Sequence, residues 1–191
     1  MNTDTSIFVG SLDDIAWVRI EGVATKDTAS GIQGYFSETF SRGLRNFTID
    51  LKDCRLIDST FIGILTGLAG SIASEGNSGE VKVIHPNERN EKSICKLGLD
   101  NLITIDRDGS SACEMESLIS QSLHPLYGGE MSKVEKASLI LDAHEKICEA
   151  NEENRSVFKD VLKFLKQDLL KWSKDGDKSA GNPGPDKGFN D

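Results

Sequence analysis

Cysteine pairs, a secretion signal and long apolar runs are absent from this sequence of 191 residues. The four cysteines lie far apart, at positions 54, 95, 113 and 148, and none forms a Cys-x-x-Cys pair. Because Cys54, Cys95 and Cys148 fall in segments with regular patterns, we expect them to be buried free thiols in a reducing compartment. The first residues lack a basic segment and an apolar core, and no apolar run approaches the length of a membrane span. We therefore expect a soluble, cytoplasmic protein that has no membrane partner.

Positive charge is also scarce. The chain carries 22 basic and 31 acidic residues, which gives a formal net charge of −9. Nucleic-acid backbones attract basic surfaces, so this balance argues against nucleic acid as a partner. An acidic protein can still bind a basic surface on another protein.

Recognisable catalytic motifs are missing as well. His85, His124 and His144 lie far apart in the sequence, and no motif pairs any of them with a nucleophile. There is no Gly-x-Ser-x-Gly elbow, no phosphate-binding glycine loop and no His-Glu-x-x-His zinc motif. His144 and Cys148 are four residues apart and could share a metal on one helix face, but two ligands make a weak site and packing is the simpler interpretation. We expect no enzymatic activity, no metal and no cofactor.

The most informative stretch that is present runs from residue 46 to residue 70. Residues 46–52 alternate apolar and polar positions and carry β-branched residues, as a strand does, and residues 60–75 form a long apolar run typical of a buried helix. Gly63, Gly67 and Gly70 would let this helix lie tightly against the sheet. Asp58, Ser59 and Thr60 stand at the helix start, where unpaired N–H groups and partial positive charge attract anions. A hydroxyl there is well placed to carry a phosphate that Asp58 would repel, although the alternative is a helix cap and nothing more.

The pattern around this stretch predicts an α/β domain in residues 1–107. Strands and helices alternate, which favours a mixed sheet with its helices packed on it. Residues 22–27 are expected to be a loop. The expected strands cover residues 6–9, 15–20, 46–52, 80–86 and 102–105, and the expected helices cover residues 28–42, 60–75 and 88–97.

The rest of the chain predicts a helical appendage. Residues 108–130 contain a short helix and a linker, and residues 131–173 form a helical hairpin that begins with a capping box at Ser132 and Glu135. The polar tail, residues 174–191, should be disordered. Two helices bury little by themselves, so the hairpin must pack on the first domain, on a second copy or on a partner. Its apolar positions are Val134, Ala137, Leu141, His144 and Cys148 in the first helix, and Val157, Phe158, Val161, Leu162, Leu165, Leu169 and Trp172 in the second.

Two segments resemble a known family. Residues 58–67, Asp-Ser-Thr-Phe-Ile-Gly-Ile-Leu-Thr-Gly, are similar to the Asp-Ser-(Ser/Thr)-Gly-Leu-Gly signature of STAS domains in bacterial anti-sigma-factor antagonists. Residues 94–103 are similar to the Leu-x-x-x-Gly-Leu-x-x-x-(Ile/Phe) ending of that family. The resemblance spans about residues 6–107, and it implies a STAS-like mixed β-sheet followed here by the C-terminal helical hairpin.

The resemblance also implies a function. In that family the serine after the aspartate is phosphorylated by a partner kinase that is also the anti-sigma factor. The matching residue is Ser59, with Thr60 as a second hydroxyl. The resemblance places partner binding at Thr25, Asp58, Ser59, Thr60, Phe61 and Ile62.

Two departures from the family pattern lie at this expected surface. Phe61 replaces the first glycine of the signature, and we expect it at the surface as a docking contact or as a shield over Ser59. The family segment Gly-Glu-(Leu/Ile)-Asp is here Gly-Val-Ala-Thr at residues 22–25, without its two acids.

Three functions follow as hypotheses. The first is a phosphorylation-regulated switch that binds an anti-sigma factor or serine protein kinase while Ser59 is unmodified. The second is a scaffold or homodimer that uses the STAS fold without regulated phosphorylation and binds through the C-terminal helices. The third is a small-ligand sensor with a pocket between the first helix and the sheet, although fold alone rarely decides a ligand.

Overall fold

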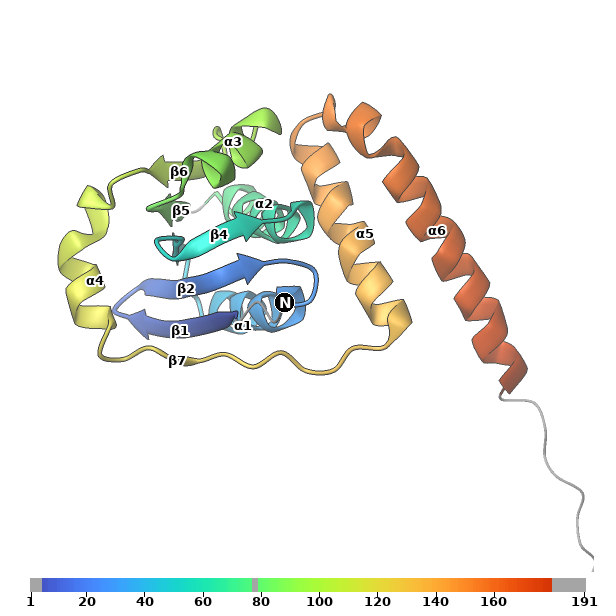
Figure 1. Ribbon diagram of the computed structural model, residues 1–191, viewed down its shortest axis with the longest axis horizontal. Coiled ribbons are helices and arrows are strands. Elements are labelled where there is room, and N and C mark those ends of the chain that lie inside the picture. The colour runs from blue at the N-terminus through green and yellow to red at the C-terminus, as the bar shows by residue number, and fades with distance from the viewer. Residues whose placement is uncertain (1–4, 77–78, 180–191) are drawn as a thin grey trace, which may run out of the picture.

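A mixed β-sheet forms the centre of the computed structural model, which describes residues 5–76 and 79–179 (Figure 1). Within these residues the strand order is β6-β5-β3-β2-β1-β7, and β4 pairs separately with β2. β2, β3, β5 and β6 run parallel, and β1 is antiparallel to both of its neighbours. The strands are β1 (Ser6–Leu12), β2 (Ile15–Ala24), β3 (Asn46–Asp50), β4 (Cys54–Ile57), β5 (Glu80–Ile84), β6 (Ile103–Asp106) and β7 (His124–Pro125).

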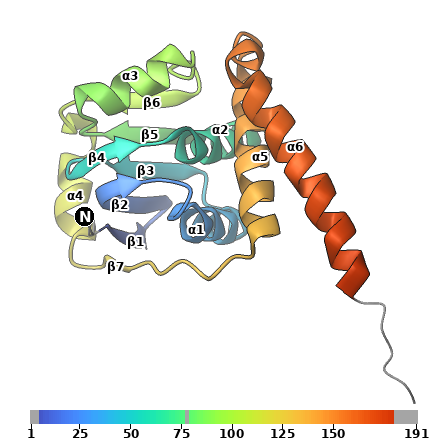
Figure 2. The same ribbon diagram turned by 45° about the vertical axis from the view of Figure 1, so that its right-hand side comes forward.

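The helices form layers on the sheet. Figure 2 shows α1 and α2 lying between the sheet and α5, with α6 on the outer side of α5. α4 lies against the opposite face of the sheet, and α3 lies near β4 and β6. The helices are α1 (Ala29–Ser41), α2 (Ser59–Ser74), α3 (Glu88–Lys96), α4 (Cys113–Ile119), α5 (Lys133–Ala150) and α6 (Asn154–Ser179), and a 3₁₀ turn precedes α4 at Ser110–Ala112. None of the helices in the described part of the chain has the length and apolar content needed to cross a membrane.

The two faces of the sheet carry separate apolar clusters. Val18, Ile20 and Ile49 belong to the large cluster that α1, α2 and α5 complete. Trp17 belongs to a smaller cluster with Ile84 and residues of the α4 region. Both faces of the central strands are therefore buried, as expected for parallel strands covered on both sides.

The predicted mixed sheet and C-terminal hairpin are confirmed, with differences in the strands. Residues 22–24, which were expected to be a loop, extend β2, where they pair with the unpredicted strand β4. β4 has only four residues, so its pattern is too short to distinguish from a loop. β7 lies inside the expected linker and pairs with β1.

The hairpin also differs in detail from the prediction. The capping box at Ser132 is present. Val134, however, is 43% exposed, because the part of α5 that packs against α2 and α6 begins one turn later, at Ala137. α6 runs to Ser179, six residues past the expected end, since the single Gly176 costs a helix only about 1 kcal/mol. The rest of the expected tail, residues 180–191, lies outside the described residues.

The expectation for the cysteines is correct in two cases. Cys54 and Cys148 are buried free thiols, whereas Cys95 is exposed, so that prediction is wrong. α3 buries only Asn90 and Ile94, and the residue after Ile94 points about 100° away around the helix, toward solvent.

Candidate functional site

Asp58 organises the start of α2. It is the N-cap residue, and its Oδ1 accepts a hydrogen bond from the Phe61 N–H at 2.9 Å. Its Oδ2 accepts a second one from the Lys26 N–H, also at 2.9 Å. One carboxylate thus satisfies an unpaired N–H of the helix and fastens the loop after β2 to it.

This loop brings Thr25 beside the helix start. Ala24 pairs with Ile57 across β2 and β4, and its carbonyl oxygen accepts from the Asp58 N–H at 2.9 Å. Thr25 follows Ala24, and Asp58 follows Ile57. The parallel pairing of β2 and β4 therefore places Thr25 and Asp58, which come from two separate predicted segments, side by side.

Ser59 is the first residue of α2, and its side chain is half-buried. Its Oγ lies 2.9 Å from Nε2 of His144 on α5. Nδ1 of His144 lies 2.7 Å from the carbonyl oxygen of Ile140, which can only accept, so Nδ1 carries the proton. In the neutral ring Nε2 is then the acceptor, and the Ser59 hydroxyl donates to it.

The Ser59–His144 contact was not predicted from sequence, where no motif paired a histidine with a nucleophile. The arrangement is that of a hydroxyl and a general base, but a backbone carbonyl orients the ring and both side chains lie in a helix–helix contact. The ring also packs edge-on against Phe158 of α6, with centroids 4.8 Å apart. Both ring nitrogens of His144 are engaged in hydrogen bonds within the protein, which fits the packing interpretation of this seam position.

The remaining predicted site residues lie inside the protein. Thr60 is 3% exposed, Phe61 0% and Ile62 2%. The expectation that Phe61 lies at the surface is therefore wrong. Because α2 lies between the sheet and α5, most of its circumference is covered, and a large apolar side chain is stabilised there by burial.

Two glycines of α2, Gly63 and Gly67, face α5 rather than the sheet, and Gly70 faces open space. A Cβ at Gly63 would overlap the main-chain carbonyl of Ala143, and one at Gly67 would lie 3.3 Å from Cγ of Lys146. Gly63 thus permits the close helix contact, which corrects the expectation that these glycines serve packing on the sheet.

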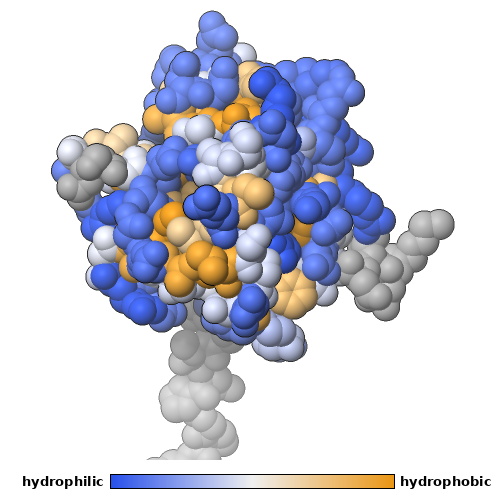
Figure 3. All heavy atoms as spheres, turned by 90° about the vertical axis from the view of Figure 1, so that its left-hand side faces the viewer, coloured by the Kyte–Doolittle hydropathy of each residue, from blue (hydrophilic) through white to orange (hydrophobic). Residues whose placement is uncertain are grey.

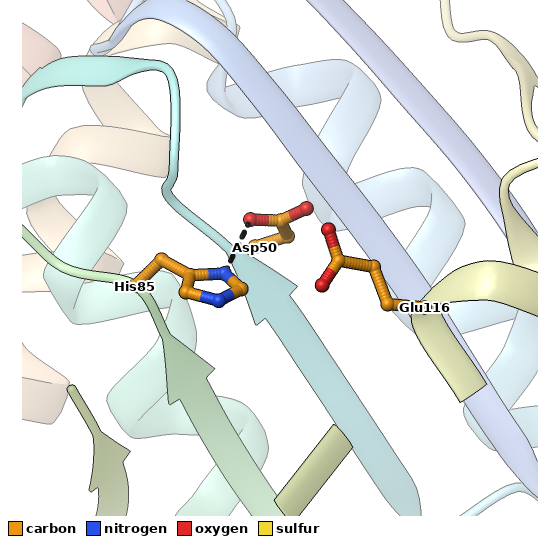
Figure 4. Close-up of side chains that lie close together, drawn as sticks. All are labelled: Asp50, His85 and Glu116. Atoms are coloured by element: carbon orange, nitrogen blue, oxygen red, sulfur yellow. Dashed lines mark hydrogen bonds and ion pairs between the residues drawn. The ribbon is translucent and has the colours of Figure 1, made fainter. Parts of the chain in front are cut away.

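A second cluster of polar side chains lies at the C-terminal edge of the parallel strands. Asp50 ends β3, His85 follows β5, and Glu116 comes from α4; their potential ligand atoms lie within 4.8 Å of one another (Figure 4). Nδ1 of His85 is 3.4 Å from Oδ1 of the buried Asp50. Sequence reasoning missed this cluster, since the three residues are far apart in the chain.

The donor set of this cluster fits an ion-pair network better than a metal. Nε of Arg19 lies 2.8 Å from Oδ2 of Asp50, and its Nη2 lies 3.6 Å from Glu116. Lys52 adds a second cation, 3.7 Å from Glu116. Two cations already balance the two carboxylates, so the network fastens α4 to the sheet.

Two hollows bear on the small-ligand hypothesis. A cavity of about 210 Å³ lies between α1, α2 and α5, not between α1 and the sheet, and it is smaller than most ligand pockets. A hollow of about 700 Å³ lies on the α4 face, lined by Trp17, Lys82, Ser110 and neighbouring residues. Figure 3 shows apolar side chains reaching the surface on this side, where Leu118 is 61% exposed. Neither hollow is lined by Ser59 or Asp58.

Comparison with known proteins identifies relatives. No family model matches the chain. A protein of Thermotoga maritima named "Putative anti-sigma factor antagonist" is 30% identical over 79 residues, which cover 41% of this chain and 68% of that protein. Its homologue in Thermotoga neapolitana matches with the same values. An anti-sigma factor antagonist from Mycobacterium paratuberculosis is similar in fold, with a TM-score of 0.50 and 16% identity over 60% of this chain and 96% of its own.

Proposed function

The chain belongs to the family of anti-sigma-factor antagonists, and on that premise we propose that it is a cytoplasmic, phosphorylation-regulated protein-binding switch. Unmodified Ser59 permits binding to an anti-sigma factor that is also a serine protein kinase, and phosphorylation of Ser59 ends that binding. The domain of residues 1–107 carries the switch, and the hairpin is its appendage. The covalent chemistry is the kinase's, which transfers phosphate from its own ATP, so the switch itself catalyses nothing.

The observation that carries this proposal is the position of Ser59 at the start of α2. Ser59 is half-buried whereas Thr60 is 3% exposed, which supports Ser59 over Thr60 as the acceptor. A phosphate adds about −1.5 to −2 charges there, next to the Asp58 carboxylate. A partner that covers this surface would have to desolvate a dianion, and a loss of about 3 kcal/mol weakens binding more than a hundredfold.

The burial of the other predicted residues divides their proposed roles. Thr25, Asp58 and Ser59 are only partly buried and support a direct partner contact. Thr60, Phe61 and Ile62 are buried, so we propose that they act by holding α2 in place beneath that contact.

The test is site-mapped mass spectrometry of the protein from its native cells, grown with and without stress. Phosphate on Ser59 that changes between the two conditions is the expected result. A second measurement compares how much partner is pulled down by the full-length wild type and by its Ser59→Ala and Ser59→Asp variants. Only Ser59→Asp should lose the partner. An unphosphorylated Ser59 under every condition, or a partner that binds Ser59→Asp unchanged, would refute the switch.

A second candidate function rests on the outer surface of α6. Val157, Val161 and Phe164 follow one another at helical spacing and are 65%, 39% and 65% exposed. This stripe supports the scaffold hypothesis, in which the helices bind a second copy or another protein. If it forms a homodimer, light scattering should show a dimer for the wild type and a monomer for Phe164→Glu; a monomeric wild type would exclude the homodimer.

A further inference from the structure

α5 covers the helix start at which the proposed switch would act. Its buried side chains include Leu139, Ala143 and Ile147, which belong to the same apolar cluster as α2 and the sheet. His144 of α5 contacts Ser59 directly, because its Nε2 accepts a hydrogen bond from the Ser59 hydroxyl. In Figure 2, α5 stands between α2 and the outer helix α6, so one side of the α2 surface is closed to any other protein.

The covered surface has the shape of a helix-binding groove. Gly63 and Gly67 lie one turn apart on α2, and neither has a side chain to fill the space that α5 occupies. Ala143, a small residue, lies opposite Gly63, so the two backbones touch. This surface fits an amphipathic helix that brings a small residue to Gly63 and a hydrogen-bond acceptor to Ser59.

We propose that this face of α2, from Ser59 through Gly63 to Gly67, is a helix-binding surface, that α5 is its intramolecular occupant, and that the partner of the switch binds by replacing α5 with a helix of the same kind. The inference rests on the proposed function, because it names the surface and the kind of partner for the same serine. It adds that the hairpin must leave before Ser59 can be reached by a kinase.

A phosphate on Ser59 and a docked α5 exclude each other. The Oγ–H that donates to His144 is lost when the phosphate is attached, and the close Gly63–Ala143 contact one turn further on holds the docked helices too near each other to make space for a phosphate. The charges of α5, four acidic and three basic side chains, offer the phosphate no net attraction that would hold the helix in place. Phosphorylation is therefore expected to release the hairpin and to keep it released.

The attachment of the hairpin suits such a release. Beyond its contact with α2, it is tied to the domain near the loop between α5 and α6, where the side-chain amides of Asn151 and Asn154 donate to the Leu97 carbonyl at 3.3 and 2.8 Å. These bonds lie at the end of α5 remote from its start at Lys133. α5 can therefore leave α2 while this end stays attached.

The first experiment is hydrogen exchange by mass spectrometry on full-length variants. Ala143→Glu places a charged side chain against Gly63 and should release the hairpin, whereas Ser138→Glu makes the same change on the exposed side of α5 and should not. Amides of α5 should exchange at least about tenfold faster in Ala143→Glu, with β3 and β5 unchanged as the internal control. Ser59→Glu, which does not alter α5 itself, should reproduce this pattern.

The second experiment uses a labelled peptide of residues 133–150, α5 itself, as the probe of the vacated surface. Fluorescence anisotropy should show binding to full-length Ala143→Glu at least about tenfold tighter than to the wild type, and a peptide carrying Ala143→Glu should not bind. Equal binding to both proteins, or no binding to an Ala143→Glu protein whose hairpin is released, would overturn the inference.

The failure of this inference is distinct from the failure of the switch. If Ser59→Glu leaves α5 as protected as in the wild type, or more so, the hairpin does not respond to charge at Ser59 and the inference is wrong. Phosphorylation of Ser59 in native cells would still decide the switch by itself. If Ala143→Glu fails to fold, hydrogen exchange of α5 in Ser59→Glu still tests the release, and the α5 peptide should not bind this variant because its charge occupies the same surface.

Discussion

At the scale of single residues, His144 joins three parts of the molecule. Its ring accepts from Ser59 of α2, donates to Ile140 of its own helix and packs against Phe158 of α6. Because Ser59 Oγ and His144 Nε2 each find their partner only when the hairpin is docked, the pair should stabilise that docking.

A double-mutant cycle measures this pair. Ser59→Ala removes the hydroxyl, and His144→Phe keeps a ring against Phe158 while it removes both nitrogens. Each change should lower the free energy of unfolding by about 1 kcal/mol, and the coupling between them should be about 0.5–1.5 kcal/mol in urea denaturation. Strictly additive effects would show that the hydrogen bond contributes nothing.

The cysteines give a second test at this scale. Burial raises the pKa of the Cys54 and Cys148 thiols, so fewer of them are thiolates at a given pH. Since the thiolate is the form that reacts, and since reagent must also reach the sulfur, these buried thiols should be alkylated more slowly than the exposed Cys113. At pH 8, iodoacetamide with peptide mapping should modify Cys113 at least about tenfold faster than Cys54. Comparable rates would contradict the burial of Cys54.

At the scale of elements, α2 contains glycines with opposite surroundings. Gly63 touches α5, whereas a Cβ at Gly70 would meet nothing within 4 Å. The same substitution should therefore have opposite effects at the two positions.

Gly70→Ala should stabilise the protein by about 0.5–1 kcal/mol, because alanine loses less backbone entropy in a helix. Gly63→Ala should destabilise it by about 1–3 kcal/mol, because the added methyl overlaps the Ala143 carbonyl. Thermal and urea denaturation of both variants measure the difference. A stabilised Gly63→Ala protein would mean that α5 does not lie against α2 in solution.

At the scale of the whole molecule, the layers differ in how much they bury. Val18, Ile49 and Val83 in the central strands are fully buried. Among the described residues of α6, in contrast, only Asn154 and Phe158 are buried side chains. The outer helices should therefore open before the sheet does.

Native-state hydrogen exchange in low urea tests this order. The amides of α6 should exchange at the lowest free energy, those of α5 next, and those of β3 and β5 only at global unfolding. Exchange of all of these segments at one common free energy would instead show a single cooperative unit.

The sequence by itself determined the local structure and the family. Alternation, capping residues and apolar spacing identified the main strands and helices, because these patterns depend on neighbours along the chain. The same applies to Asp58, whose cap role follows from its position before a helical run.

Only the tertiary structure decided what covers the candidate site. Ser59 and His144 are 85 positions apart, and no local pattern tells which helix face meets which. The same holds for Phe61, which is buried because α5 and the sheet enclose α2 from both sides. Side-chain burial and long-range hydrogen bonds depend on how the layers stack, and that stacking arises from packing of the whole core.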